Sequence, residues 1–243
     1  MDKTKLLTFI EKYNLGGSVE SVKLVADGTT LKTSFVAEDK TLAGSVTLNS
    51  CDIEKSELGI FETAKFKTFL KILGDSIKID LNKQDDRLVG LMLSDDNTEV
   101  NFVLSDLSVI PKAPAVKSPK DFDLEIPIDA NFVDRFVKAK NALPDVDSFT
   151  LMMNKKGDKL ELVIGFASIN SNRIKVEVKA NAGKDKLDKP ISFNANYFKE
   201  ILLKNSEATG AVFKVASLGI ANISFTTPDF DANYFLIKKE IEG

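Results

Sequence analysis

Hydrophobic and polar residues alternate along most of the chain in short segments. These segments are rich in Val, Ile, Phe and Thr, and they are bounded by Asp, Asn, Gly or Ser. A period of two with turn residues at regular spacing is typical of antiparallel β-sheet. The pattern predicts strands at residues 19–26, 31–37, 44–48, 76–81, 88–93, 99–104, 148–153, 159–166, 173–180, 210–215, 221–226 and 233–238.

Four longer segments have apolar residues at helical spacing. The pattern predicts helices at residues 3–13, 63–75, 130–143 and 195–205. Asp129 and Asn194 directly precede two of them and are predicted N-caps, because their side chains accept hydrogen bonds from the first helical N–H groups. In the second helix Phe66 lies on the apolar face, whereas Lys67 and Lys71 lie one turn apart on the opposite face.

The order of these elements is helix, strands, helix, strands, and it occurs twice. Between the two halves, residues 109–123 (VIPKAPAVKSPKDFD) contain three prolines and no periodicity, which is typical of an extended linker. A shift of 132 residues superimposes Phe66 and Lys67 on Phe198 and Lys199, which indicates a duplicated fold. We therefore predict an α+β fold of two similar domains, each with antiparallel sheets and two helices. The predicted boundaries are 1–108 for the first domain, 109–123 for the linker and 124–243 for the second domain.

The composition excludes several classes of chemistry. The 243 residues contain no histidine, so Ser-His-Asp and Cys-His catalysis and ordinary zinc sites are excluded. No GxxxxGK[ST] or GxGxxG stretch is present to bind phosphates. Acidic pairs such as Asp95–Asp96 lie in turn-like contexts and are interpreted as solvated turns rather than magnesium ligands. We therefore expect a protein that is not an enzyme and that needs no cofactor or metal.

Further absences concern the location of the protein. No apolar run approaches the ~18 residues of a membrane span, and no signal-peptide pattern opens the chain. The lone Cys51 excludes an intramolecular disulfide and suits a reducing interior. We expect a cytoplasmic protein without a membrane partner.

Basic residues gather on the polar faces of the predicted helices, although the formal net charge of the chain is −3. The candidate cations are Lys5, Lys12, Lys67, Lys71, Arg135, Lys138 and Lys199. One interpretation is simple solvation, since lysine is a good helix former. The other is an anionic partner, because like charges at i and i+4 repel unless a negative charge is supplied from outside the helix.

Two further patterns leave alternatives open. The regular strands at 99–104 and 173–180 either pair within their own sheets or form edges that pair with another chain. Apolar residues before the prolines and near the C-terminus either close the core or line a groove for a peptide. The candidates for the groove are Leu107, Val109, Ile110, Tyr234, Phe235 and Leu236.

With this organisation the sequence resembles a DNA sliding clamp. It is most similar to the trimeric two-domain clamps of T-even-type bacteriophages, whose fold is shared by proliferating cell nuclear antigen. Beyond the order of elements, three segments carry the resemblance: FKTFLKILGDSIKIDL (66–81), FNANYFKEILLKN (193–205) and FDANYFL (230–236).

The resemblance implies a homotrimeric ring around duplex DNA, with the helices lining the hole and the sheets outside. The seven cations would face phosphates without reading the base sequence. The ring would hold a DNA polymerase on its template during DNA replication, and an ATP-dependent clamp loader would open it. Partner peptides would bind beside the linker, in the groove described above.

The resemblance also implies the subunit contacts and the place of action. Strand 99–104 of one chain would pair with strand 173–180 of the next, through Val100, Phe102, Leu104, Ile174, Val176 and Val178. A phage protein of this kind would act in the host cytoplasm. Glu11, Asp134 and Glu200 fall near the inner faces, so DNA contact is expected to be uneven. Two alternatives are a non-ring DNA-binding polymerase accessory protein of the same fold and a β-rich structural virion protein.

Overall fold

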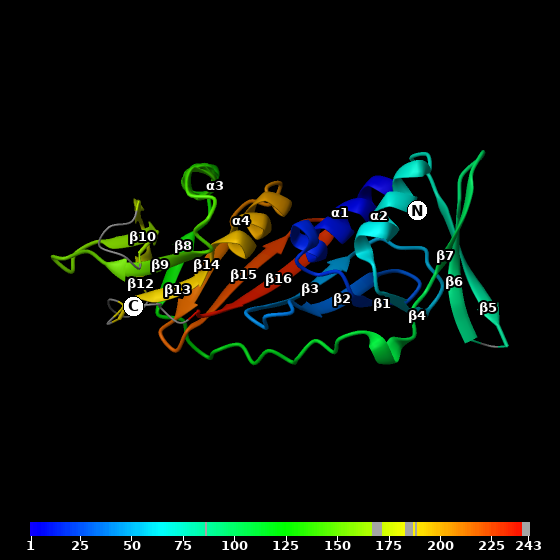
Figure 1. Ribbon diagram of the computed structural model, residues 1–243, viewed down its shortest axis with the longest axis horizontal. Helices are drawn as coiled ribbons and strands as arrows, with labels where there is room; N and C mark the ends of the chain where they lie inside the picture. Colours follow the sequence, from blue (N-terminus) through cyan, green and yellow to red (C-terminus); the bar gives the residue numbers. More distant parts are fainter. Residues whose placement is uncertain (86, 167–171, 183–186, 188, 240–243) are drawn as a thin grey trace. The chain divides into compact units, whose positions relative to one another are not determined.

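The computed structural model describes residues 1–85, 87–166, 172–182, 187 and 189–239. The chain forms two compact units (Figure 1). The first unit contains Met1–Glu38, Ala43–Pro114 and Thr226–Ala232. The second contains Asp39–Leu42, Ala115–Phe225 and Asn233–Gly243. Each unit thus takes in a short segment from a distant part of the sequence.

The first unit combines two helices with antiparallel strands. Its helices are α1 (Lys3–Asn14) and α2 (Thr63–Ile72), with short 3-10 turns η1 (Leu15–Gly17) and η2 (Leu107–Val109). Its strands are β1 (Val22–Ala26), β2 (Leu31–Val36), β3 (Leu42–Leu48), β4 (Ser56–Ile60), β5 (Lys78–Gln84), β6 (Arg87–Ser94) and β7 (Glu99–Val103). Strands run side by side in the orders β4-β1-β2-β3 and β5-β6-β7.

The second unit repeats this plan. Its helices are α3 (Ala130–Ala142) and α4 (Ala195–Lys204). Its strands are β8 (Leu124–Pro127), β9 (Ser148–Met153), β10 (Leu160–Ile164), β11 (Ile174–Val178), β12 (Asn181–Ala182), β13 (Ile191–Asn194), β14 (Val212–Ala216), β15 (Ile220–Thr226) and β16 (Phe230–Ile237). They run in the orders β12-β8-β14-β15-β16 and β11-β10-β9-β13. Residues 111–123 contain neither helix nor strand.

Helices α3 and α4 begin directly after Asp129 and Asn194, the N-cap residues that the sequence predicted. The Asp129 carboxylate accepts a hydrogen bond from Phe132 N at 2.7 Å, and the Asn194 side chain accepts from Asn196 N and Tyr197 N. Asp2 caps α1 in the same way, accepting from Lys5 N at 3.0 Å. The predicted α+β fold, with antiparallel sheets and paired helices in both halves, is confirmed.

Phenylalanine fills both cores. In the first unit the Phe66 ring of α2 lies 4.8 Å from the Phe102 ring of β7, between centroids. In the second unit Phe198 of α4 lies 4.6 Å from Phe213 and 4.9 Å from Phe149. Buried aromatic rings contribute large apolar areas, so these contacts fix the helices on their sheets. None of the helices in the described part of the chain is both long and apolar enough to cross a membrane.

Candidate functional site

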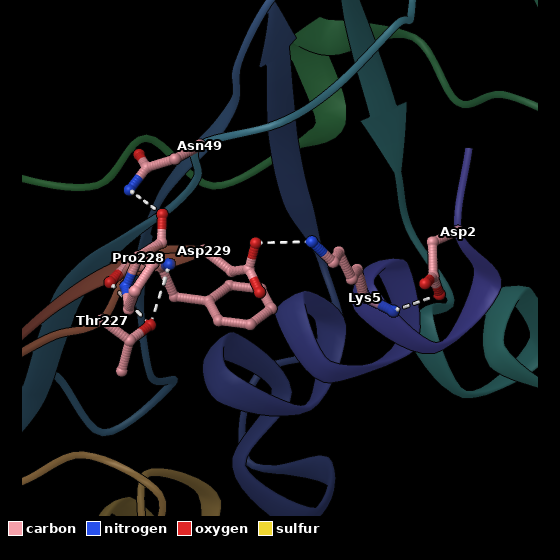
Figure 2. Close-up of polar contacts among 7 residues, drawn as sticks. Asp2, Lys5, Asn49, Thr227, Pro228 and Asp229 are labelled. Atoms are coloured by element: carbon pink, nitrogen blue, oxygen red, sulfur yellow. Dashed lines mark hydrogen bonds and ion pairs between the residues drawn. The ribbon is translucent and has the colours of Figure 1, made fainter.

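Lys5 of α1 forms an ion pair with a distant turn. Its Nζ lies 2.6 Å from Oδ1 of Asp229, 224 residues away in sequence (Figure 2). The turn is held in place because Phe230 N donates to the Thr227 hydroxyl at 3.0 Å and Asn49 N donates to the Asp229 carbonyl at 2.8 Å. The hydrogen bond to Asp229 raises the pKa of Lys5. Lys5 is therefore ammonium, with its charge already balanced within the unit.

Lys12 is not on an exposed face, which corrects the expectation from its helical position. The residue is 1% exposed, and its Nζ lies 5.2 Å from the centre of the Phe230 ring. A cation over an aromatic face is attracted by the ring quadrupole. The physical reason for the difference is a residue from a distant part of the sequence, because the Phe230 ring lies against the Lys12 side chain of α1. Lys12 does not present its charge to solvent in this structure.

The two lysines of α2 differ in their surroundings. Lys67 Nζ lies 3.2 Å from the Glu11 carboxylate of α1, and its side chain is only 18% exposed. Lys71 is exposed, and no carboxylate in the described part of the chain lies within ion-pair distance of it. Glu11 of α1 thus acts as the counterion of Lys67, whereas Lys71 has no such counterion among the described residues. Lys65, which lies outside the predicted set of cations, is also exposed on α2 but pairs with Glu62 at 3.6 Å.

In the second unit, too, some predicted cations have an ion-pair partner and others do not. Lys138 pairs with Asp134 one turn earlier at 2.9 Å, whereas Arg135 is exposed and Lys199 is half-buried. Neither of the latter has a carboxylate at ion-pair distance among the described residues.

The helix end near Lys199 holds a lysine that the pattern did not single out. Lys140 is buried, and its Nζ donates to the Pro144 carbonyl at 2.9 Å, which closes the end of α3. Burial, and then the charge of Lys199, lower the pKa of Lys140. Among the predicted cations that the structure describes, those that face solvent without an internal counterion are Lys71, Arg135 and Lys199.

The expected peptide groove is only partly assembled. A pocket of 440 Å³ in the first unit is lined by Leu107 and Ile110, and lysines lie around it. These lysines are Lys23, Lys32 and Lys112. Val109 is exposed but does not line this pocket. Glu57 also lines the pocket and pairs with Lys23 at 2.9 Å, and Lys32 pairs with Asp27 at 3.9 Å, so the pocket combines apolar residues with lysines that are partly neutralised.

The C-terminal residues expected in this groove are instead buried. Tyr234 and Leu236 are 0% exposed, and Phe235 is also buried. The Tyr234 hydroxyl accepts a hydrogen bond from Asn205 at 3.0 Å, and burial raises its pKa. Their expected exposure is corrected, because β16 is covered on both faces at this point. Core closure was the alternative interpretation of this pattern.

The two strands predicted to join subunits both lie at sheet edges. β7 is the outer strand of β5-β6-β7, and β11 is the outer strand of β11-β10-β9-β13. On β7, Val100 is half-buried and Phe102 is buried, and Leu104, which is half-buried, follows the end of the strand at Val103. On β11, Ile174 and Val176 are half-buried and Val178 is buried. Edge strands present backbone N–H and C=O groups that are available for pairing.

Apolar side chains lie exposed beside the β7 edge. Val103 is 72% exposed, and Phe61 is also exposed. Both line a pocket of 370 Å³ together with Phe69 and Phe102. Exposed apolar surface next to a free edge is typical of a protein–protein contact.

The described residues contain no group of three or more His, Cys, Asp or Glu side chains arranged to hold a metal ion.

Comparison with known proteins relates the chain to others by fold. No protein-family model and no curated protein matches the sequence. Among solved structures, the proliferating cellular nuclear antigen of Entamoeba histolytica matches with a TM-score of 0.70 and 15% sequence identity. The match covers 99% of this chain and 97% of that protein. Across its whole length, the chain has the fold of proliferating cell nuclear antigen, the sliding-clamp fold that the resemblance implied.

Proposed function

We propose that this protein is a sliding clamp: a non-catalytic ring that encircles duplex DNA and tethers a DNA polymerase to it. The observation that carries the proposal is the whole-chain likeness to a proliferating cellular nuclear antigen. In this proposal residues 1–108 and 124–243 are the two clamp domains, and residues 109–123 connect them. The ring is a homotrimer of the T-even bacteriophage type that an ATP-dependent loader opens, and it acts in the host cytoplasm.

The charges on the helices support a DNA-facing role. Lys71, Arg135 and Lys199 project from α2, α3 and α4 without a carboxylate partner among the described residues, so phosphates would be their counterions. Lys5, Lys67 and Lys138 would exchange an internal carboxylate for a phosphate. Contacts of this kind are independent of base sequence and weaken as salt rises, as sliding requires.

The free edges of β7 and β11 support the proposed subunit contacts, and the pocket lined by Leu107 and Ile110 supports the proposed binding of partner peptides. In the proposed ring, β7 of one chain pairs with β11 of the next, so that Val100, Phe102 and Leu104 meet Ile174, Val176 and Val178. Partner peptides, including one from the polymerase, bind the pocket lined by Leu107 and Ile110. Among its lysines, Lys112 has no carboxylate at ion-pair distance in the described part of the chain, and it favours a peptide with an acidic residue beside an apolar anchor.

Two measurements test this proposal together. The native mass should equal three chains of 26.7 kDa, about 80 kDa. Protein loaded on closed circular DNA should remain bound and should leave when the circle is cut, since a ring slides off a free end. A monomer that binds linear and circular DNA equally would indicate the non-ring accessory protein. An assembly that neither binds DNA nor stimulates a polymerase would indicate the structural virion protein.

A further inference from the structure

A pocket of 560 Å³ lies between α3 and α4 in the second unit. Its walls are mostly apolar, and they include Val133, Val137, Leu202, Leu203 and Phe225. Its volume falls in the range of pockets that bind small molecules, about 300–1,000 Å³. The pocket is distinct from the one proposed for partner peptides, which belongs to the first unit.

The polar groups of this pocket include two carboxylates and one helix end. The Asp129 carboxylate caps α3 and accepts from Phe132 N, the Asp134 carboxylate pairs with Lys138 at 2.9 Å, and Asn205 and Ser206 follow the C-terminal end of α4. The C-terminus of a helix carries a partial negative charge and favours cations. An apolar wall beside a negative rim is complementary to a ligand with an aliphatic body and a cationic end.

The first unit shows how the same chain fills the equivalent place. Asp2 caps α1 as Asp129 caps α3, so Lys3 is the counterpart of Ala130. The Lys3 side chain is only 15% exposed, and its Nζ donates to the Leu73 carbonyl at 2.6 Å. Leu73 is the C-cap of α2, just as Asn205 is the C-cap of α4.

The start of the first helix and the end of the second helix are therefore connected differently in the two units. In the first unit an aliphatic chain runs from the start of α1 to the end of α2, and its ammonium also pairs with Asp75 at 3.5 Å. In the second unit alanine stands at this position, and Ala130 lines the pocket. Where the first unit has a lysine side chain, the second has a pocket.

We propose that the α3–α4 pocket binds a small aliphatic ammonium ion from solution, a primary amine or diamine. Its methylene chain lies against Val133, Val137 and Leu202, and its ammonium takes the place that the Lys3 ammonium occupies in the first unit. The cation is held by the C-terminal end of α4 and by the carboxylate of Asp129.

Methyl NMR titration of the full-length protein tests the proposal. Hexylammonium chloride should shift the methyl signals of Val133 and Leu203 to saturation. Hexan-1-ol, which has the same chain without the charge, should bind at least about tenfold more weakly, because it lacks the charge-assisted hydrogen bond. Equal affinity for the alcohol, or no saturable shift with hexylammonium, would overturn the assignment.

Two exchanges between the units provide matched variants. Ala130→Lys supplies the side chain in cis and should abolish the shifts. Lys3→Ala should create a second site, seen as new saturable shifts at Leu6 and Leu70. Unchanged binding to Ala130→Lys would contradict the proposal, and that comparison holds even if Lys3→Ala destabilises the first unit.

One further ligand separates a free amine from a partner's lysine. Nα-acetyl-lysine methylamide carries the same ammonium on a peptide-like backbone. Weaker binding than hexylammonium supports a small-molecule site. Tighter binding would assign the pocket to a protein lysine and overturn the small-molecule proposal.

Discussion

The ammonium of Lys67 on α2 lies 3.2 Å from the carboxylate of Glu11 on α1. One helix of the first unit thus neutralises a cation of the other. Of the two lysines one turn apart on α2, only Lys71 faces solvent without such a partner among the described residues. In the proposed clamp, DNA has to displace Glu11 before it can use the charge of Lys67.

Glu11→Gln should strengthen DNA binding, because it frees Lys67 for a phosphate. The slope of log affinity against log salt should steepen by about 0.9 for each additional phosphate that the variant neutralises. The free energy of unfolding should change by less than about 1 kcal/mol, since a partly exposed ion pair contributes little. Fluorescence anisotropy with duplex DNA at several salt concentrations measures the slope. Glu57→Gln, which removes the partner of Lys23 on a strand, is the control and should leave the slope unchanged.

Lys71→Glu should weaken DNA binding and polymerase stimulation without affecting the fold. The loss of a phosphate contact should reduce the salt slope by about 1 for each chain whose Lys71 touches DNA. Lys78→Glu on β5 is a control of equal charge change away from the helices. If both variants reduce stimulation equally, overall net charge rather than the α2 face would be responsible.

Lys12→Met should leave DNA affinity unchanged within about twofold, because Lys12 is buried over Phe230. Methionine keeps the length and the aromatic contact but not the charge. Loss of the cation–π contact should lower the unfolding free energy by up to about 2 kcal/mol. Urea denaturation and the same anisotropy assay measure the two effects. A loss of affinity as large as that of Lys71→Glu would show that Lys12 reaches the DNA.

Acid should weaken the turn between β1 and β2 through Asp27. The Thr30 hydroxyl, followed by the Thr30 and Thr29 backbone N–H groups, lowers the pKa of Asp27. A depressed folded-state pKa stabilises the fold above the ordinary aspartate range, and this stabilisation is lost as pH falls toward the folded value. In Asp27→Asn the decline of stability between about pH 5 and pH 2 should be shallower than in the wild type. Urea denaturation across this range measures it, and an identical decline would exclude Asp27 as a contributor.

Ile174→Lys should dissociate the proposed trimer. A charge on the half-buried face of the β11 edge would be desolvated if another strand pairs there, which is costly. Native mass spectrometry should show the chain mass of 26.7 kDa with circular dichroism unchanged. Leu218→Lys, at an exposed turn between β14 and β15, should leave assembly intact. An intact trimer in Ile174→Lys would place the interface elsewhere.

Sequence patterning captured the elements in which one face is exposed. β2 alternates buried and exposed positions, so its period of two is visible in the sequence. β13 is buried at every position and β4 at three in succession, so neither alternates and both were missed. A short apolar run of this kind does not distinguish a strand from other buried segments.

At the candidate site, the sequence likewise predicts ion pairs within one helix but not those between distant segments. Asp134 and Lys138 are four residues apart on one helix, so their ion pair can be predicted from the sequence. Glu11 and Lys67 lie on different helices, and Asp229 is 224 residues from Lys5. The helical period identified basic faces, but the counterions that reduce their charge depend on tertiary structure.

The segment 226–232 sets an order for the synthesis of this protein. It belongs to the first unit, yet the ribosome adds it after nearly all of the second. The Asp229 partner of Lys5 and the Phe230 ring over Lys12 are therefore absent while the first unit emerges. Domains commonly fold in sequence order during translation. Here the first unit is completed only after residues 115–225 of the second unit have been synthesised.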